Sequence, residues 1–152
     1  VDDIDFLHTA LEFVEQRNRQ AIRDVILPLG VDAVLFYGDC AYRNGLMVSP
    51  PVYHQLTYDR TAESVRGLRS ADIPYTFHTD VKLDDVVPML IDLGFSAVHC
   101  VESLANDLLY IKCRFVIQIT LMVNMDIYFL VIATEIEVRY STRNMLAVGS
   151  PI

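Results

Sequence analysis

The sequence predicts an α/β fold in which short parallel strands alternate with helices. Four apolar runs contain the β-branched and aromatic residues that favour strands, and longer segments with helical periodicity separate them. Each run leads into ionisable or polar side chains, which is how buried parallel strands present chemistry at one rim of a sheet. The runs and their polar endings are Val31–Tyr37 with Asp39, Tyr75–Phe77 with His78 and Asp80, Phe95–Val98 with His99 and Cys100, and Gln118–Val123 with Asn124 and Asp126.

The first two helices have clear start and stop signals. Apolar residues at three-to-four spacing predict a helix over residues 3–27, which Pro28 and Gly30 end. Ser49 suits the N-cap of the next helix, because its oxygen can accept a backbone N–H. A proline follows it at the first helical position, where no hydrogen bond is lost, so we expect a helix over residues 50–70.

The later helices are shorter and are placed by their caps. Pro88 lies early enough in its helix to be tolerated, and Gly94 ends that helix. Ser103 caps the following one, and Thr134 with Glu137 matches a capping box at the start of the last. The three helices are expected over residues 83–93, 103–114 and 135–147.

This order of elements permits two architectures for a single domain over residues 1–152. Strands separated by helices imply parallel pairing through right-handed crossovers. One architecture is part of a (β/α)8 barrel, since a complete barrel needs about 250 residues. The other is an open doubly wound sheet, although the phosphate fingerprints GxGxxG and GxxxxGK[ST] are absent. In both, Val31–Tyr37 is apolar without alternation, so we expect a strand covered on both faces.

Composition and charge exclude several classes of function. The chain is 53% hydrophobic and 21% charged, as globular proteins are, and its net charge of -8 disfavours nucleic acid and anionic membranes as partners. Asp126 interrupts the longest apolar run, Ile117–Ala133, so we expect no membrane span. The cysteines form no CxxC pair and the first residues are acidic, unlike a secretory signal, so we expect a cytoplasmic protein.

A series of short motifs occurs in the order found in a known family. They are Gly38-Asp39, Gly45–Pro50, His78-Thr79-Asp80, Asp92-Leu93-Gly94, Asn106-Asp107 with Lys112, Leu121–Asp126, Thr134-Glu135 and Val138-Arg139. In these motifs, from about residue 20 to the C-terminus, the chain resembles the uroporphyrinogen decarboxylase superfamily, which includes cobalamin-dependent methyltransferases. The resemblance implies the later part of a (β/α)8 barrel, a truncated or half barrel, that binds a tetrapyrrole or a corrinoid-borne methyl group at the C-terminal strand ends.

Within the family, the resemblance leaves decarboxylation and methyl transfer open. His78-x-Asp80 is similar to the methyltransferase branch, in which a His-x-Cys or His-x-Asp follows this strand and zinc binds the Cys and a second Cys. The arginine-rich N-terminal segment of the decarboxylases has no counterpart here. The family usually has Gly where this chain has Val81, Val116 and Val123, and a β-branched residue resists positive φ and close backbone approach. The cofactors implied are zinc or a corrinoid, with none established by the residues themselves.

The candidate site residues lie at or beyond the ends of the predicted strands. The candidate catalytic residues are Asp39, His78, Asp80 and Asp126, the candidate substrate-binding residues are Tyr42, Ser49 and Asn124, and His78 is also the candidate metal ligand. His78 would act as an acid or base, with Asp80 orienting its ring. Structural roles compete with these: an Asx turn at Asp39, a helix cap at Ser49, and a cap or turn at Asp126.

Other metal ligands are open as well. Zinc needs about four ligands of this kind, and they would come from different strands: His78, His99, Cys40 or Cys100 with Asp80 or Glu102. Because His99 and Cys100 are adjacent in a strand, at most one of them faces a barrel interior. Cys113 falls in a predicted helix, where we expect it to pack.

A second, non-enzymatic hypothesis follows from the number of strands. Four parallel strands without their partners leave two open edges. A second copy of the chain, or a longer partner, would complete the barrel. We therefore also expect a homo-oligomer or a barrel-completing partner, with the chain acting as an inactive assembly or binding module.

Overall fold

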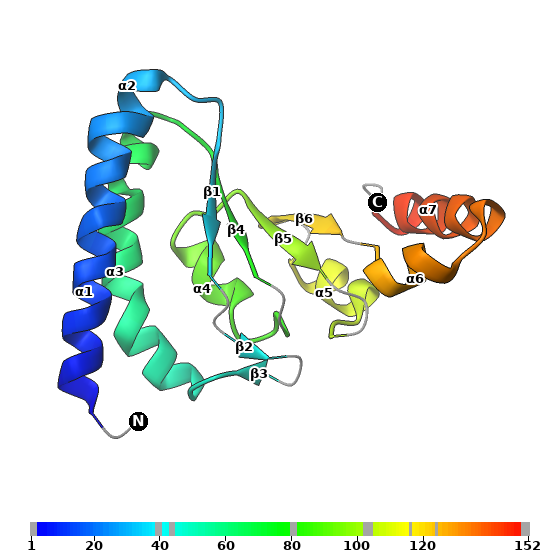
Figure 1. The fold of residues 1–152 in the computed structure, drawn as a ribbon, viewed down its shortest axis with the longest axis horizontal. Coiled ribbons are helices and arrows are strands. Elements are labelled where there is room, and N and C mark those ends of the chain that lie inside the picture. The colour runs from blue at the N-terminus through cyan, green and yellow to red at the C-terminus, as the bar shows by residue number, and fades with distance from the viewer. Residues whose placement is uncertain are drawn as a thin grey trace.

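The computed structural model has a four-stranded parallel sheet flanked by helices (Figure 1). It describes residues 3–38, 41–42, 45–79, 82–101, 105–115, 117–123 and 125–149, without the side chains of residues 41, 42, 100, 123, 148 and 149. The strand order is β1-β4-β5-β6, and each neighbouring pair is parallel. The predicted α/β class and the parallel pairing of the four apolar runs are therefore confirmed.

The elements follow one another largely as expected, with shorter strands and three unpredicted pieces. The strands of the sheet are β1 (Val34–Tyr37), β4 (Tyr75–His78), β5 (Ala97–Val101) and β6 (Thr120–Val123), and a small antiparallel pair is formed by β2 (Ala41–Tyr42) and β3 (Gly45–Leu46). The helices are α1 (Ile4–Ala21), a π-helical turn (Ile22–Ile26), α2 (Leu27–Leu29), α3 (Pro50–Ser70), α4 (Val87–Asp92), α5 (Leu108–Phe115), α6 (Ile127–Ile132) and α7 (Glu135–Gly149). The β2–β3 pair, the π-helical turn and α6 were not predicted.

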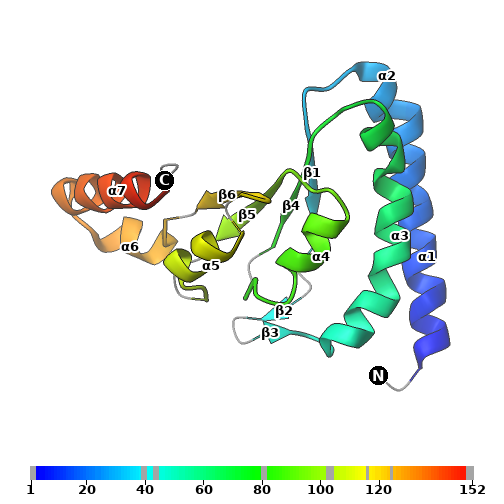
Figure 2. The same ribbon diagram turned by 180° about the vertical axis from the view of Figure 1, so that it is seen from behind.

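The N-terminal helix is longer than the sequence indicated. Asp3 caps it by accepting the Phe6 N–H at 2.8 Å, and helical structure continues through the π-helical turn and past Pro28. It ends where Gly30 takes a left-handed conformation with φ 63°. Pro28 does not stop the helix because it falls at the first positions of α2, where a missing N–H costs little. α1 packs along α3, and the two helices stand side by side at the β1 end of the sheet (Figures 1 and 2).

The structure confirms the predicted capping box of α7 but only the position of the predicted cap of α3. Ser49 does precede α3, but its side chain makes no capping hydrogen bond, so only the position of that prediction is right. The capping box of α7 is confirmed, because the Thr134 N–H donates to Glu137 Oε2 at 2.8 Å and the Glu137 N–H donates to Thr134 Oγ1 at 3.4 Å. α4 begins at Val87, later than predicted, with Pro88 in its first turn.

One face of the sheet is covered by helices and forms the core. Figure 2 shows α4 and α5 in front of this face. Because side chains alternate along a strand, the register assigns the residues of each face. The helix-covered face carries Val34, Phe36, Tyr75, Phe77, Val98 and Leu121. Side chains packed there and almost fully buried include Leu68, Val86, Val87, Leu90, Leu93, Val98 and Ile111.

The other face, which we call the open face, is not covered by a helix among the described residues. It carries Leu35, Tyr37, Thr76, His78, Ala97, His99, Thr120 and Met122. Leu35 is 58% exposed and Tyr37 is 69% exposed, so the prediction that β1 is covered on both faces is wrong. The run is apolar on both faces, but the described helices form a layer over one of them only.

The C-terminal helices are apolar and exposed. None of the six residues of α6 is buried, and Tyr128, Val131 and Ile132 each expose more than three quarters of their surface. Ile136 and Tyr140 of α7 are similarly exposed. Figure 1 shows both helices extending beyond β6, away from the α1–α3 pair. Within the part of the chain that is described, no helix combines the length and apolar character needed to cross a membrane.

Candidate functional site

A row of four side chains crosses the open face near the carboxyl ends of the strands. Tyr37 is the register partner of His78, His78 of His99, and His99 of Met122. Residues in register on neighbouring parallel strands point to the same face and lie about 4.8 Å apart along the sheet. The row is therefore Tyr37–His78–His99–Met122, with one residue from each of β1, β4, β5 and β6.

The two histidines at the centre of the row are hydrogen-bonded to each other. Nδ1 of His78 lies 2.6 Å from Nδ1 of His99, and the ring centroids are 4.8 Å apart. Such a bond requires one Nδ1–H donor and one Nδ1 lone pair, so the rings share a single hydrogen between them. The pair is half-buried, which leaves it accessible from the open face.

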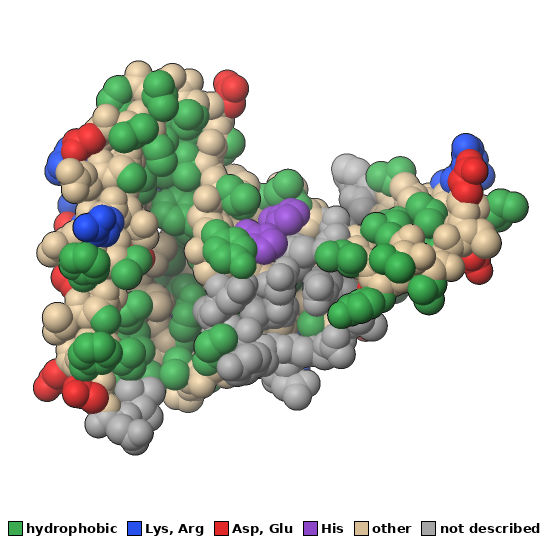
Figure 3. Space-filling view, in the orientation of Figure 1, with side chains coloured by type: hydrophobic (Ala, Val, Ile, Leu, Met, Phe, Trp, Pro, Cys, Tyr) green, Lys and Arg blue, Asp and Glu red, His purple; other side chains and the backbone are tan. Residues whose placement is uncertain are grey.

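Apolar side chains flank the histidine pair on both sides. The Tyr37 ring stacks on His78 with centroids 4.9 Å apart and planes 14° apart. On the other side, Met122 is 44% exposed. Figure 3 shows histidine side chains together in the middle of this face, next to hydrophobic side chains. The row thus places the histidine nitrogens between two side chains that offer apolar surface.

The predicted catalytic and binding residues are only partly placed. His78 lies at the carboxyl end of β4 as expected. Asp126 caps α6, where its Oδ1 accepts the Phe129 N–H at 3.0 Å, as its structural alternative predicted. Ser49 lies at the start of α3, and its side chain accepts no capping hydrogen bond. Asp39, Asp80, Asn124 and the side chain of Tyr42 lie outside the described residues.

The side chains that could bind a metal ion also differ from the expected ligand set. Of the proposed ligands, His78 and His99 come together, whereas Cys40, Cys100, Asp80 and Glu102 lack described side chains. Among the described residues, no three His, Cys, Asp or Glu side chains are grouped around a common point. The described donors are two imidazoles beside a thioether, without the thiolates of the zinc set that the family resemblance implies. The described residues therefore do not fit the zinc site of that family. Cys113 is exposed on α5, so the expectation that it packs is wrong.

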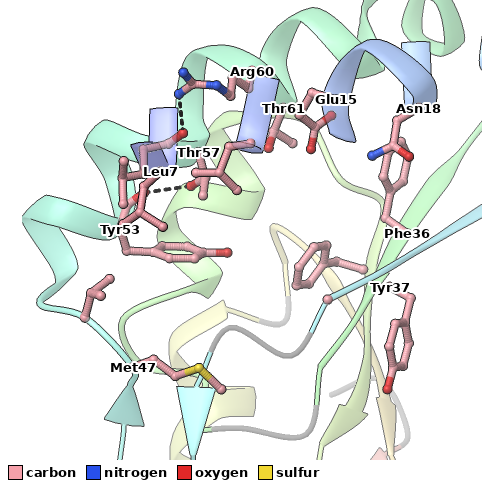
Figure 4. Close-up of a pocket in the computed structure, with 15 residues that line it drawn as sticks. Leu7, Glu15, Asn18, Phe36, Tyr37, Met47, Tyr53, Thr57, Arg60 and Thr61 are labelled. Carbon is pink, nitrogen blue, oxygen red and sulfur yellow. Dashed lines mark hydrogen bonds between the residues drawn. The ribbon is translucent and has the colours of Figure 1, made fainter. Parts of the chain in front are cut away.

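A separate cavity of about 360 Å³ lies between the helix pair and the sheet. Figure 4 shows one wall formed by α1 and α3 and the other by the end of β1. Phe36 and Phe77 line it from the helix-covered face, and Tyr37 of the open face borders both this cavity and the histidine pair. Its other lining residues are Leu7, Leu11, Glu15, Asn18, Gly38, Met47, Val48, Tyr53, Leu56, Thr57, Arg60 and Thr61.

The charged side chains beside this cavity hold the two helices together. Arg60 Nη1 donates to the Leu56 carbonyl at 2.6 Å, and its Nη2 donates to the His8 carbonyl at 3.3 Å. Arg19 donates to Glu12 at 2.5 Å, and this hydrogen bond is the main reason why the pKa of Glu12 lies below its ordinary value. Arg60 thereby links α3 to α1, and these polar groups have a structural role.

The sequence offered His78 and His99 as possible ligands of one metal ion, but it could not show that their rings would contact each other. Both residues ended predicted strands, but the register that brings their Nδ1 atoms together depends on the pairing of β4 with β5. Nothing in the sequence indicated that Met122 belongs to a site, because a methionine in an apolar run usually indicates packing. The signal that was present is the strand-end position itself.

Comparisons with protein-family models, with curated proteins and with solved structures found no match for this chain. Its functional interpretation therefore comes from the open face and from the motifs of the sequence.

Proposed function

We propose that the open face is the inner, ligand-binding surface of a (β/α)8-type barrel that takes a tetrapyrrole or a corrinoid-borne methyl group. The observation that carries this proposal is the row Tyr37–His78–His99–Met122 at the carboxyl ends of parallel strands. In barrel enzymes this end of the strands holds the reacting groups. The order of the sequence motifs is similar to that of the uroporphyrinogen decarboxylase superfamily and suggests the class of ligand.

The winding of the sheet supports a barrel-type architecture over a doubly wound one. The order β1-β4-β5-β6 follows the chain, without reversal among the described strands. A doubly wound sheet reverses its order at a switch point, whereas a barrel adds each strand beside the previous one. The helices α4 and α5 lie on one face, as the outer layer of a barrel does, which leaves the open face in the place of the interior (Figure 2).

The chemistry of the row suits a flat ligand that carries carboxylates. Tyr37 and Met122 offer apolar surface on which a macrocycle can lie. The histidine pair lies between them and, with one N–H used in its own hydrogen bond, has one N–H left that can hydrogen-bond a carboxylate. In a decarboxylation, loss of carbon dioxide leaves an electron pair on carbon that must take up a proton. An imidazole N–H of His78 or His99, or the Tyr37 hydroxyl, can donate this proton.

Titration of the purified chain with uroporphyrin, and separately with hydroxocobalamin, tests this proposal. Binding is followed by the change in the absorption of the ligand. We expect one saturable site for at least one of them. His78→Ala and His99→Ala should each weaken it about tenfold, because each removes hydrogen bonds to a charged group worth about 1.5 kcal/mol.

His54→Ala is the matched control for this titration. His54 stacks on Tyr58 with ring centroids 4.5 Å apart, on α3 and outside the row, so its loss should leave affinity unchanged. Turnover is then assayed with uroporphyrinogen, and with methylcobalamin and a thiol. Absence of binding by the unaltered chain, or equal affinity of all three histidine variants, would refute the proposal.

We also infer a second candidate function, assembly, from the exposed apolar surface at both ends of the sheet. β1 and β6 are the edges of the described sheet, and beyond β6 the apolar side chains of α6 and α7 are uncovered. Two copies related by a two-fold axis could pair β6 of each with β1 of the other, in parallel, and so close eight strands. A second copy would then cover both the open face and α6.

Sedimentation over a range of concentrations tests this assembly. A dimer is expected, and Val131→Glu on α6 should weaken it. Leu109→Glu is the control, because Leu109 is 60% exposed on α5, which lies on the outer side of the proposed barrel. A monomer at every concentration would rule out closure by a second copy, and equal effects of both variants would argue against the proposed interface.

A further inference from the structure

We propose that His78, His99 and Met122 form a binding site for a copper ion on the open face. The site uses residues of the row described above, but it requires neither a macrocycle nor closure of a barrel. It goes beyond the proposed function, because copper is neither a tetrapyrrole nor a corrinoid and would bind the isolated chain.

The spacing of the two imidazole nitrogens is close to what a metal ion requires. Nδ1 of His78 and Nδ1 of His99 are 2.6 Å apart and share one hydrogen. Metal–nitrogen bonds of about 2.0–2.1 Å hold two adjacent ligand nitrogens about 2.9–3.4 Å apart. The two Nδ1 atoms therefore need to move apart by less than about 1 Å, and the rings need to turn so that both lone pairs point at the ion that replaces the shared hydrogen.

Metal binding at this pair needs no net loss of protons. In the neutral pair, one ring carries its hydrogen on Nδ1 and the other has a lone pair there. When the metal binds, the first ring transfers its hydrogen from Nδ1 to Nε2 through solvent, and both Nδ1 lone pairs become ligands. Each ring remains a neutral imidazole, which is the form that ligates metals.

The donor types favour copper over other divalent ions. Imidazole binds zinc, copper and nickel, and among divalent ions of the first transition row copper binds a given site most tightly. Met122 is the register partner of His99 on β6 and belongs to the same face. Its thioether is a soft donor that selects Cu(I), and its unbranched side chain reaches neighbouring positions with little strain. The net charge of -8 further favours a cation as ligand.

Access to the site comes from the open side of the sheet. Met122 is 44% exposed, and the histidine pair is half-buried. Tyr37 stacks against His78 and so limits the directions in which that ring can turn. The pair is therefore held in place from one side and open to an ion from the other. A strand pair that fixes two imidazoles in advance reduces the entropy lost on binding.

Titration of the unaltered chain with Cu(II), in the presence of a weak competing chelator, tests the site. We expect one equivalent to bind, with an electron paramagnetic resonance spectrum that shows coupling to imidazole nitrogens. His78→Gln and His99→Gln should each lower the affinity at least about tenfold. His54→Gln should bind as the unaltered chain does. Circular dichroism confirms that the variants keep the fold.

Two further variants separate ligation from a merely structural role. His99→Cys replaces one soft or borderline ligand by another, so it should retain tight binding where His99→Gln loses it. Met122→Leu should lower the affinity for Cu(I), measured by competition with a coloured Cu(I) chelator, and leave the affinity for Zn(II) unchanged.

Unchanged Cu(II) affinity in both glutamine variants would overturn the proposal, as would copper bound no more tightly than zinc. Copper binding by a chain that binds neither uroporphyrin nor hydroxocobalamin would support this site while refuting the proposed function. The opposite result would refute this site alone.

Discussion

The two faces of the sheet both carry apolar side chains, but these side chains have different surroundings. On the helix-covered face, Val98 is completely buried and Tyr75 is 3% exposed. On the open face, Leu35 and Tyr37 of the same sheet expose more than half of their surface. The alternation along β1 divides a uniformly apolar run between these two environments.

This difference shows that apolar residues in a strand can have more than one role. On the helix-covered face they stabilise the fold through burial against α4 and α5. On the open face that contribution is small for Leu35 and Tyr37, and exposed apolar side chains beside polar groups favour a binding region. The interpretation of the open face as functional follows from this contrast, and it can be tested residue by residue.

The largest effect on stability should come from a leucine of the core. Leu90→Ala on α4 removes a fully buried side chain, so it should lower the free energy of unfolding by about 2–5 kcal/mol. Leu35→Ala is the matched control on the open face and should change it by about 0.5 kcal/mol or less. Both are measured by urea denaturation at a concentration at which the chain is monomeric. Equal losses would mean that the two faces are not distinct.

A smaller effect is expected at the turn between α4 and β5. Gly94 has φ 81°, and a Cβ there would lie 2.6 Å from Arg69 Nη2 and 2.9 Å from the Tyr75 hydroxyl. Tyr75 donates to the Leu93 carbonyl at 2.9 Å, so this contact cannot relax freely. Gly94→Ala should therefore destabilise the chain by about 1–3 kcal/mol.

Gly30→Ala separates the conformational cost of a positive φ from the steric cost of the added Cβ. Gly30 also has a positive φ, of 63°, but a Cβ added there would meet no atom within 4 Å. Only the conformational cost remains, which is about 1 kcal/mol. Thermal denaturation of both variants checks whether Gly94→Ala is the more destabilising of the two. A larger loss for Gly30→Ala would contradict the packing described around Gly94.

Removal of the N-cap of α6 should affect the stability of that helix only. Asp126→Ala removes the hydrogen bond to the Phe129 N–H, and loss of such a cap costs about 1 kcal/mol of helix stability. Because α6 has no buried residue, the loss should appear as faster amide exchange in α6 and not as a change in the unfolding midpoint. A fall in the midpoint comparable to that of Leu90→Ala would show that α6 is packed more firmly.

The smallest effect concerns the pH dependence of α7. The Thr134 N–H, followed by its hydroxyl, lowers the pKa of Glu137 below its ordinary value. A carboxylate with a lowered pKa stabilises the folded helix above its unfolded-state pKa, and this contribution is lost as the pH falls through the lowered value. Helicity of α7 should therefore decrease at acid pH, measured by carbon chemical shifts. In Glu137→Gln the decrease should be absent, and its persistence there would assign it to another group.

The order of elements was predictable because it depends on local signals. Apolar periodicity, Gly94 after α4 and the capping box at Thr134 and Glu137 each act over a few residues. α6 was missed because a six-residue apolar segment has too little periodicity to distinguish helix from strand. The first helix extends past its predicted end because Pro28 stands in the first turn of a new helical segment, where proline is tolerated.

The candidate site was predictable only in outline. Strand-end positions identified His78, and the alternation rule required that His99 and Cys100 face opposite sides. The contact between His78 and His99 depends on strand register, and the exposure of Leu35 and Tyr37 depends on which layers cover the sheet. Neither quantity is contained in a local pattern, so the histidine pair and the open face emerge only from the fold.

The most direct test of the open face is a ligand titration followed by methyl resonances in solution. Uroporphyrin is added to the chain labelled at leucine, valine and methionine methyls. We predict that the resonances of Leu35 and Met122 shift, while those of Val98 and Leu90 on the helix-covered face do not. Shifts confined to Leu7, Leu11 and Leu56 would place the ligand in the cavity between α1, α3 and the sheet, and would contradict the account.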